Sequence, residues 1–110
     1  MKKSNYLAQL AAGAALLGFA TVPVHAQSAG ETLYKAKCAV CHGADGKGET
    51  AIGKTNKLRA LGSADVQKHS DAELTGIIAN GKNKMPGYGK SLKSEQIKEL
   101  VAYVRALGKN

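Results

Sequence analysis

The sequence has few of the residues that build a large or cross-linked core. Its 110 residues include no tryptophan, one phenylalanine, two prolines and two cysteines. Two cysteines exclude a scaffold of several disulfides, and the lack of tryptophan limits aromatic packing. Because a domain this small commonly needs a disulfide, a metal or a cofactor to hold it together, we expect such a group here.

Long apolar runs are also scarce, and the main one lies at the N-terminus. Two lysines precede an apolar stretch from Leu7 to Ala20, and Val24-His25-Ala26 forms a small-residue cleavage site. The stretch is shorter than the roughly 20 residues of a membrane span. We therefore predict a secretory signal over residues 1–26 and one exported domain over 27–110, with an uncleaved anchor as the alternative. No later segment predicts a membrane span.

Cys38-Ala39-Val40-Cys41-His42 is the most specific pattern in the chain. C-x-x-C-H is the attachment sequence of a c-type haem. Two intervening residues place both sulfurs on one side of a helical turn, where each can form a thioether with a vinyl group of the porphyrin. The neighbouring imidazole then becomes the proximal iron ligand. The pattern predicts one haem c attached through Cys38 and Cys41 and ligated by His42.

Two other sites share part of this pattern. A C-x-x-C pair can be a redox disulfide, but thioredoxin-like enzymes place it in a βαβ unit, and no alternation of strands and helices is visible. A structural zinc site needs four ligands, usually a second C-x-x-C or a histidine pair, and the chain has no third cysteine. Both alternatives therefore lack their usual context.

The remaining sequence predicts helices joined by glycine-rich loops. Gly30 to Cys38 predicts a short helix that delivers the cysteines, and Gly43 to Lys68 predicts a long loop around the functional site. The apolar residues of that loop are either inward contacts or ordinary core residues. They are Ile52, Leu58 and Leu61.

Two further helices have clear signals. Ser70 and Glu73 form a capping box, and Gly81 predicts the end of that helix. Ser94 is expected to cap a longer helix, which Gly108 ends. The apolar residues of this last helix recur at intervals of three or four. They are Ile97, Leu100, Val101, Val104 and Leu107.

The loop between these two helices contains Met85, which is the candidate for the second iron ligand. Methionine with histidine is a known haem pairing, and this methionine lies in a Gly/Pro loop rather than on an apolar helix face. His69 is the alternative, although it precedes a helix cap in a polar stretch, where a solvated surface imidazole is the commoner explanation. Two strong ligands favour electron transfer, whereas one leaves the iron open to gases or peroxide.

Together these residues resemble the small class I cytochromes c, especially the short c6-like and c555-like monohaem proteins of bacteria. The resemblance covers nearly all of the chain after residue 26. It rests on the attachment motif, on Asp71–Leu74, on Met85–Tyr88 and on Leu100–Val104. It implies an all-α fold of three to four helices and loops around one covalent haem c.

By that resemblance Cys38 and Cys41 are the thioether residues, His42 the proximal ligand and Met85 the distal ligand. It also implies that the first and last helices cross, with Gly30 close to Tyr103. Many members have a proline about ten residues after the histidine, whose carbonyl accepts the ring N–H. Since this chain has only Pro86 after the signal, a backbone carbonyl near Ile52 is expected to take that role.

The implied function is a soluble, periplasmic one-electron carrier between respiratory or photosynthetic partners, and not an enzyme. Sixteen Lys and Arg against eight Asp and Glu suit docking to acidic surfaces of a reductase and an oxidase or reaction centre. An exported monomer is expected, without nucleic acid. The alternatives are a redox subunit of a periplasmic dehydrogenase and an open-site haem sensor or enzyme. The lysines nearest the two ligand segments are Lys35, Lys37, Lys47, Lys82, Lys84, Lys90 and Lys93.

Overall fold

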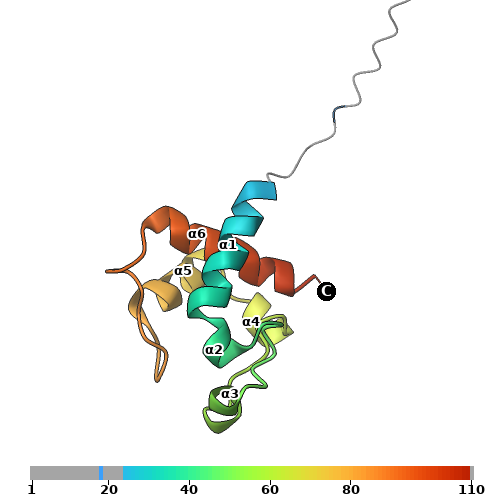
Figure 1. Ribbon diagram of the computed structural model, residues 1–110, viewed down its shortest axis with the longest axis vertical. Coiled ribbons are helices and arrows are strands. Elements are labelled where there is room, and N and C mark those ends of the chain that lie inside the picture. Colours follow the sequence, from blue (N-terminus) through green and yellow to red (C-terminus); the bar gives the residue numbers. More distant parts are fainter. Residues whose placement is uncertain (1–17, 19–23, 110) are drawn as a thin grey trace, which may run out of the picture.

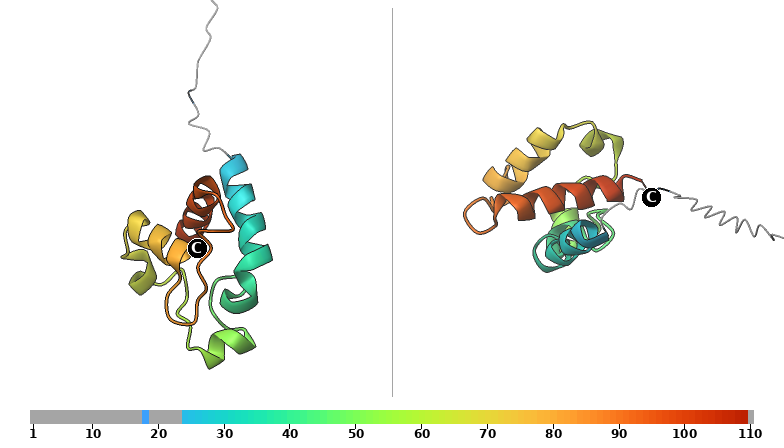
Figure 2. Two further views of the ribbon diagram at one scale, coloured as in Figure 1. Left: turned by 90° about the vertical axis from the view of Figure 1, so that its left-hand side faces the viewer. Right: turned by 90° about the horizontal axis from the view of Figure 1, so that it is seen from above.

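The computed structural model describes Gly18 and residues 24–109, and this part of the chain is helical, without strands. The helices are α1 (Val24–Lys37), α2 (Ala39–His42), α3 (Ala51–Thr55), α4 (Ala64–Gln67), α5 (Asp71–Asn80) and α6 (Ser94–Leu107). Helix α6 lies between α1 on one side and α5 on the other (Figures 1 and 2). The all-α fold is confirmed, and most of the predicted signal, residues 1–26, lies outside the described residues.

Helices α1 and α6 cross at Gly30, as the resemblance implies. A Cβ built on Gly30 would lie 3.3 Å from the Cβ of Tyr103 and closer still to the backbone of Glu99. Just beyond the crossing, Tyr34 and Leu100 are almost fully buried. Helix α1 begins at Val24, earlier than the predicted Gly30, because this segment contains no proline and nothing else that stops a helix.

Helix α6 supplies the largest share of the core. Its buried residues are Ile97, Leu100, Val101 and Val104, which confirms the predicted spacing. The N-cap is Lys93 rather than the predicted Ser94, which is the first helical residue. The backbone N–H of Lys93 donates to Oε1 of Gln96 at 2.8 Å, which is the half of a capping box that the third helical residue supplies.

Helix α5 begins and ends where the sequence predicts. Ser70 Oγ accepts a hydrogen bond from the Glu73 N–H at 3.1 Å, and Gly81 follows the helix with φ +79°. Leu74 on its buried face packs with Val101 and Val104 of α6. This packing positions the loop after α5 beside α6.

The segment from Gly43 to Lys68 is less irregular than predicted, because it contains α3 and α4. These helices have five and four residues, too few for an apolar periodicity to show in the sequence. Thr50 caps α3 by accepting a hydrogen bond from the Gly53 N–H at 2.9 Å. The segment therefore folds through caps and turns around the site that it encloses.

Arg105 of α6 braces the connection between α4 and α5. Its Nε donates to Oδ1 of Asp71 at 2.9 Å, and its Nη1 donates to the Gln67 carbonyl at 2.8 Å. Its Nη2 donates to the carbonyl of His69. The planar guanidinium can bond in several directions at once, so one side chain holds this connection against α6.

Candidate functional site

The attachment motif lies where α1 passes into α2. The Cys38 N–H continues α1 by donating to the Tyr34 carbonyl at 2.8 Å, and the His42 N–H donates to the Cys38 carbonyl at 2.9 Å. Cys38 and Cys41 are three residues apart in this helical segment and so share one face. Both are free thiols in the structure, so the arrangement does not show the redox disulfide.

Met85 lies in a tight turn after α5. The Lys82 N–H donates to the Met85 carbonyl at 3.1 Å, and the Met85 N–H donates to the Lys82 carbonyl at 2.9 Å. Asn83 within the turn has φ +55°, a conformation that asparagine tolerates better than most residues. Beyond the turn, the Tyr88 N–H donates to the Ile78 carbonyl at 2.8 Å, which ties the loop back to α5.

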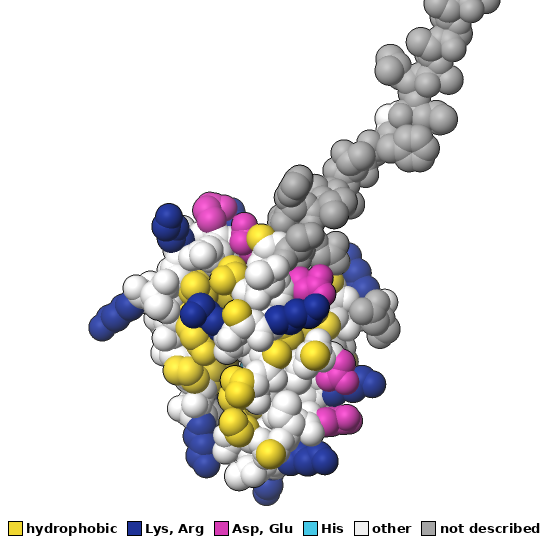
Figure 3. Space-filling view, viewed as in Figure 1, with side chains coloured by type: hydrophobic (Ala, Val, Ile, Leu, Met, Phe, Trp, Pro, Cys, Tyr) yellow, Lys and Arg dark blue, Asp and Glu magenta, His cyan; other side chains and the backbone are white. Residues whose placement is uncertain are grey.

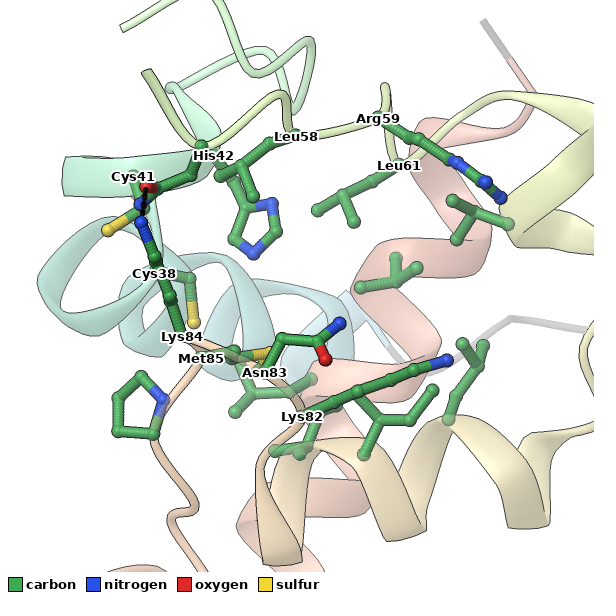
Figure 4. Close-up of a pocket in the computed structure, with 18 of the residues that line it drawn as sticks. Cys38, Cys41, His42, Leu58, Arg59, Leu61, Lys82, Asn83, Lys84 and Met85 are labelled. Carbon is green, nitrogen blue, oxygen red and sulfur yellow. Dashed lines mark hydrogen bonds between the residues drawn. The ribbon is translucent and has the colours of Figure 1, made fainter. Parts of the chain in front are cut away.

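A cavity of about 660 Å³ separates these two segments. In Figure 4 the imidazole of His42 points into it from one wall, and Met85 lies on the opposite wall. Cys38 and Cys41 lie together at one end of the cavity, beside His42. The volume falls within the range of about 300–1,000 Å³ that is common for cofactor pockets.

The rest of the cavity lining is largely apolar and comes from most of the described chain, α1 and α6 included. Leu58 and Leu61 of the segment between α3 and α4 point into it, as one of the two interpretations of the loop predicted. Ile52 does not line it and is 43% exposed, so that residue is neither an inward contact nor a core residue. The other apolar lining residues are Tyr34, Val66, Leu74, Ile77, Ile78, Pro86, Tyr88, Leu100 and Val104.

Burial disfavours the charged forms of His42 and Cys38. Desolvation lowers the pKa of His42, which favours the neutral imidazole that binds metals. Desolvation likewise raises the pKa of the Cys38 thiol. The His42 Nδ1 atom is buried and has no hydrogen-bond partner among the described residues, so the expected acceptor near Ile52 is not in place.

His69, the alternative ligand, also lines the cavity. Its Nδ1 atom lies 2.6 Å from Oε2 of Glu73, a residue of the first turn of α5. Since Met85 is the residue that faces His42 across the cavity, the geometry favours Met85 as the second ligand.

This set of residues fits a haem c. The cavity holds two thiols beside one imidazole, a thioether on the facing wall and an apolar lining between them. Zinc fits less well, because no group of three His, Cys, Asp or Glu side chains in the part of the chain that the structure describes could hold a metal ion.

The sequence did not predict the hydroxyl groups of Tyr34, Thr50 and Tyr88 around this site. Each bonds a backbone carbonyl, and no local pattern of residues indicates such a bond.

Exposed cations surround the opening of the cavity. Of the lysines singled out in the sequence, Lys37, Lys82 and Lys84 line it, and Lys57 and Arg59 join them. Arg59 and Lys82 extend toward the end of the cavity away from the cysteines (Figure 4). Lys35, Lys47, Lys90 and Lys93 lie outside the cavity, and Lys35 pairs with Glu31 at 2.9 Å.

Figure 3 shows apolar side chains in a band down one face of the molecule. Lys and Arg side chains project along its left and lower margins, and others lie within the band and beside Asp and Glu on the right. Val40 and Ile52 are the large hydrophobic residues exposed among those described. In the described part of the chain, no helix has the length and apolar character needed to cross a bilayer.

Comparisons with known proteins agree with this geometry. The family described as cytochrome C oxidase, cbb3-type, subunit III matches residues 25–104. A cytochrome c6 of Nostoc sp. is 38% identical, with 99% of this chain and 95% of that protein covered. A cytochrome c6 of Rippkaea orientalis is 40% identical, with 72% of this chain and 68% of the relative covered.

Two further comparisons come from a larger protein and a solved structure. The cbb3-type cytochrome c oxidase subunit FixP of Azorhizobium caulinodans is 34% identical over 84% of this chain, which spans 31% of that subunit. The solved c-type cytochrome KustC0563 superposes with a TM-score of 0.66 at 34% identity, covering 71% of this chain and 95% of that one.

Proposed function

Because the chain belongs to the cytochrome c family, as a small class I member with one covalently attached haem c, we propose that it is a diffusible periplasmic one-electron carrier. Electron transfer, rather than enzymatic turnover, follows from that membership. We propose in addition that the protein is exported to the periplasm, that His42 and Met85 are its iron ligands, and that its partners are redox proteins. The facing positions of His42 and Met85 carry the proposal.

The attachment residues have separate tasks. Cys38 and Cys41, at one end of the cavity, would form the two thioethers. His42 would bind the iron through its Nε2 atom, since its Nδ1 atom is buried within the protein. Arg59 and Lys82 bring positive charge to the other end, where it suits the carboxylates on the porphyrin edge opposite the vinyl groups.

Met85 decides the reaction class in this proposal. A bound haem supplies a one-electron Fe(III)/Fe(II) couple, and a second protein ligand leaves no iron position free for a gas or peroxide. The turn from Lys82 to Met85 holds the thioether on the wall facing His42. A methionine ligand also raises the reduction potential relative to a second histidine. The open-site sensor or enzyme is therefore disfavoured.

Partners are expected to have acidic docking surfaces. Five exposed cations, Lys37, Lys57, Arg59, Lys82 and Lys84, line the cavity and outnumber its one carboxylate, Asp65, which lies 3.7 Å from Arg59. A concentration of one charge around a cofactor pocket raises the rate of encounter with an oppositely charged protein more than it raises affinity. Such redox encounters bury little surface and dissociate quickly, which suits a shuttle between a donor and an acceptor.

A second candidate is a fixed subunit of a larger redox complex. The match to one part of FixP shows that this kind of domain occurs within an oxidase subunit. The dedicated subunit of a periplasmic dehydrogenase belongs to the same class of function. Size-exclusion chromatography of protein from its native source separates the candidates, since a carrier elutes as a monomer and a subunit elutes with its complex.

The proposal is tested by expressing the chain with a haem-maturation system. We expect haem that stays attached under denaturing conditions, a c-type reduced spectrum and a weak long-wavelength band of the ferric protein. Cys38→Ala with Cys41→Ala should abolish covalent attachment, and Met85→Ala should abolish the long-wavelength band. His69→Ala is the matched control and should leave the band in place. A wild-type ferric protein without the band, whose spectrum changes in His69→Ala but not in Met85→Ala, would reverse the ligand assignment.

A further inference from the structure

Hydroxyl groups hold the backbone carbonyls of the two residues that flank His42 in the sequence. Thr50 Oγ1 donates to the Cys41 carbonyl at 2.6 Å, and the Tyr34 hydroxyl donates to the Gly43 carbonyl at 2.6 Å. Carbonyls in the last turn of a helix have no partner within it and are commonly left to water. Here protein side chains bond them instead.

Tyr34 makes its bond from within the α1–α6 core. Its side chain is 1% exposed, and its ring lies against that of Tyr103, with centroids 4.9 Å apart. Desolvation raises the pKa of Tyr34, so the phenol remains protonated and able to donate. A buried hydroxyl without a partner is costly, so this contact ties the Gly43 carbonyl firmly to the core.

Thr50 acts from the opposite side, through α3. The same oxygen that donates to the Cys41 carbonyl accepts the Gly53 N–H at 2.9 Å and caps α3. Between these contacts, the Gly48 N–H donates to the His42 carbonyl at 2.7 Å. Three consecutive carbonyls are thus bonded to residues outside α2.

These contacts matter because the imidazole lacks its usual support. A histidine that binds a metal normally donates its second ring N–H to an acceptor, which fixes the ring orientation. The His42 Nδ1 atom has no such partner among the described residues. The orientation of the ring then depends on the backbone that carries it.

We propose that Tyr34 and Thr50 are positioning residues for His42: their hydroxyl groups fix the carbonyls of the flanking residues Gly43 and Cys41, and so the backbone that sets the plane of the imidazole at the iron. The inference rests on the proposed function, which makes His42 the proximal ligand. It predicts that removing either hydroxyl rotates the imidazole while Met85 stays in place.

The test uses Tyr34→Phe and Thr50→Val in the full haem-loaded chain. Proton NMR of the ferric protein reports the plane of the axial imidazole through the pattern of haem-methyl shifts, and we expect that pattern to change in both variants. The Gly46 N–H donates to the Gly43 carbonyl at 3.1 Å, as the Gly48 N–H does to that of His42. Loosening these carbonyls by a typical hydrogen bond should also speed hydrogen exchange at both amides about fivefold. The long-wavelength methionine band should remain.

Matched control variants distinguish a specific effect on the orientation of His42 from a general loss of packing. Tyr103→Phe removes a hydroxyl from the partner ring, and Thr75→Val removes an exposed hydroxyl from α5, outside the cavity lining. Both should keep the wild-type methyl pattern. Thr50→Ser retains the hydroxyl and should restore the pattern that Thr50→Val loses.

An unchanged methyl pattern in both Tyr34→Phe and Thr50→Val would overturn the inference, as would equal changes in the two controls. If Tyr34→Phe does not fold, Thr50→Val with its serine rescue decides alone, because Thr50 is only part-buried. The proposed function fails separately: a haem spectrum unaffected by His42→Ala would show that His42 is not the ligand.

Discussion

Gly30 of α1 lies directly against the backbone of Glu99 in α6. A Cβ on Gly30 would approach the Glu99 carbonyl carbon to 3.0 Å, in addition to the carbonyl oxygen. Gly30→Ala should therefore separate the two helices and lower the free energy of unfolding by about 1–3 kcal/mol, as overpacking does. Chemical denaturation of the haem-loaded protein measures this loss.

Gly76→Ala is the control for that substitution. Gly76 lies within α5, and no atom comes within 4 Å of a Cβ built there. Alanine in place of a helical glycine should stabilise by about 0.5–1 kcal/mol. A loss at Gly76 as large as that at Gly30 would mean that the crossing of α1 and α6 is not the cause.

Arg105 should be a major contributor to stability outside the cavity. Arg105→Lys keeps the charge but loses the planar group that bonds Asp71 and the Gln67 carbonyl. We expect a loss of about 1.5–3 kcal/mol, as for hydrogen bonds from a charged donor. Arg59→Lys, in an exposed pair with Asp65 at 3.7 Å, should cost less than about 0.5 kcal/mol. If urea denaturation showed equal losses of stability in Arg105→Lys and Arg59→Lys, the bonds of Arg105 to the connection between α4 and α5 would not be the cause.

Glu73 gives the stability a dependence on acid pH. The hydrogen bond from His69 holds the pKa of Glu73 below its ordinary value of 4.5. A carboxylate with a lowered folded pKa contributes stability above its unfolded pKa and loses it as the pH falls through the folded pKa.

The melting temperature of Glu73→Gln should therefore lie below that of the wild type at about pH 6 and converge with it near pH 3. Thermal melts across that range measure the difference. Glu49→Gln, an exposed carboxylate without an ion pair among the described residues, should follow the wild type throughout. A constant gap between Glu73→Gln and the wild type at all pH values would refute the linkage.

Lysines at the cavity opening should govern the encounter with an acidic redox partner. Replacing Lys37, Lys82 and Lys84 by Gln should lower the association rate at low salt about tenfold or more and flatten its salt dependence. Stopped-flow electron transfer to an acidic redox protein measures both. The same change at Lys90, Lys93 and Lys109, outside the cavity lining, controls for net charge. Equal effects of the two triple variants would rule out a localised docking surface.

The parts of the fold that the sequence predicted have local signals. Ser70 and Glu73 mark the start of α5 within four residues, and the apolar spacing of α6 follows from a helix with one buried face. The placement of Met85 in a loop followed from its Gly and Pro neighbours. The all-α class and the crossing at Gly30 came with the family resemblance.

The parts that the sequence did not predict depend on distant contacts. The Arg105 brace joins residues 34 to 38 positions apart, and Lys84 Nζ donates to Oδ1 of Asn56, 28 positions away, at 3.3 Å. Helices α3 and α4 are too short for periodicity, and the exposure of Ile52 depends on how α3 lies on the surface. The Tyr34 bond to Gly43 needs the end of α1 to meet the loop after α2, which no pattern of residue types specifies.

An electron carrier needs Met85 to close the iron position opposite His42. Addition of carbon monoxide to the reduced protein tests this most directly, because the gas binds only where the sixth ligand is absent or easily displaced. We expect the optical spectrum of the wild type to stay unchanged under carbon monoxide, while that of Met85→Ala shifts at once. A strong shift in the wild type would show that Met85 does not close the iron, and ligand binding or catalysis at an open iron would then be the better description.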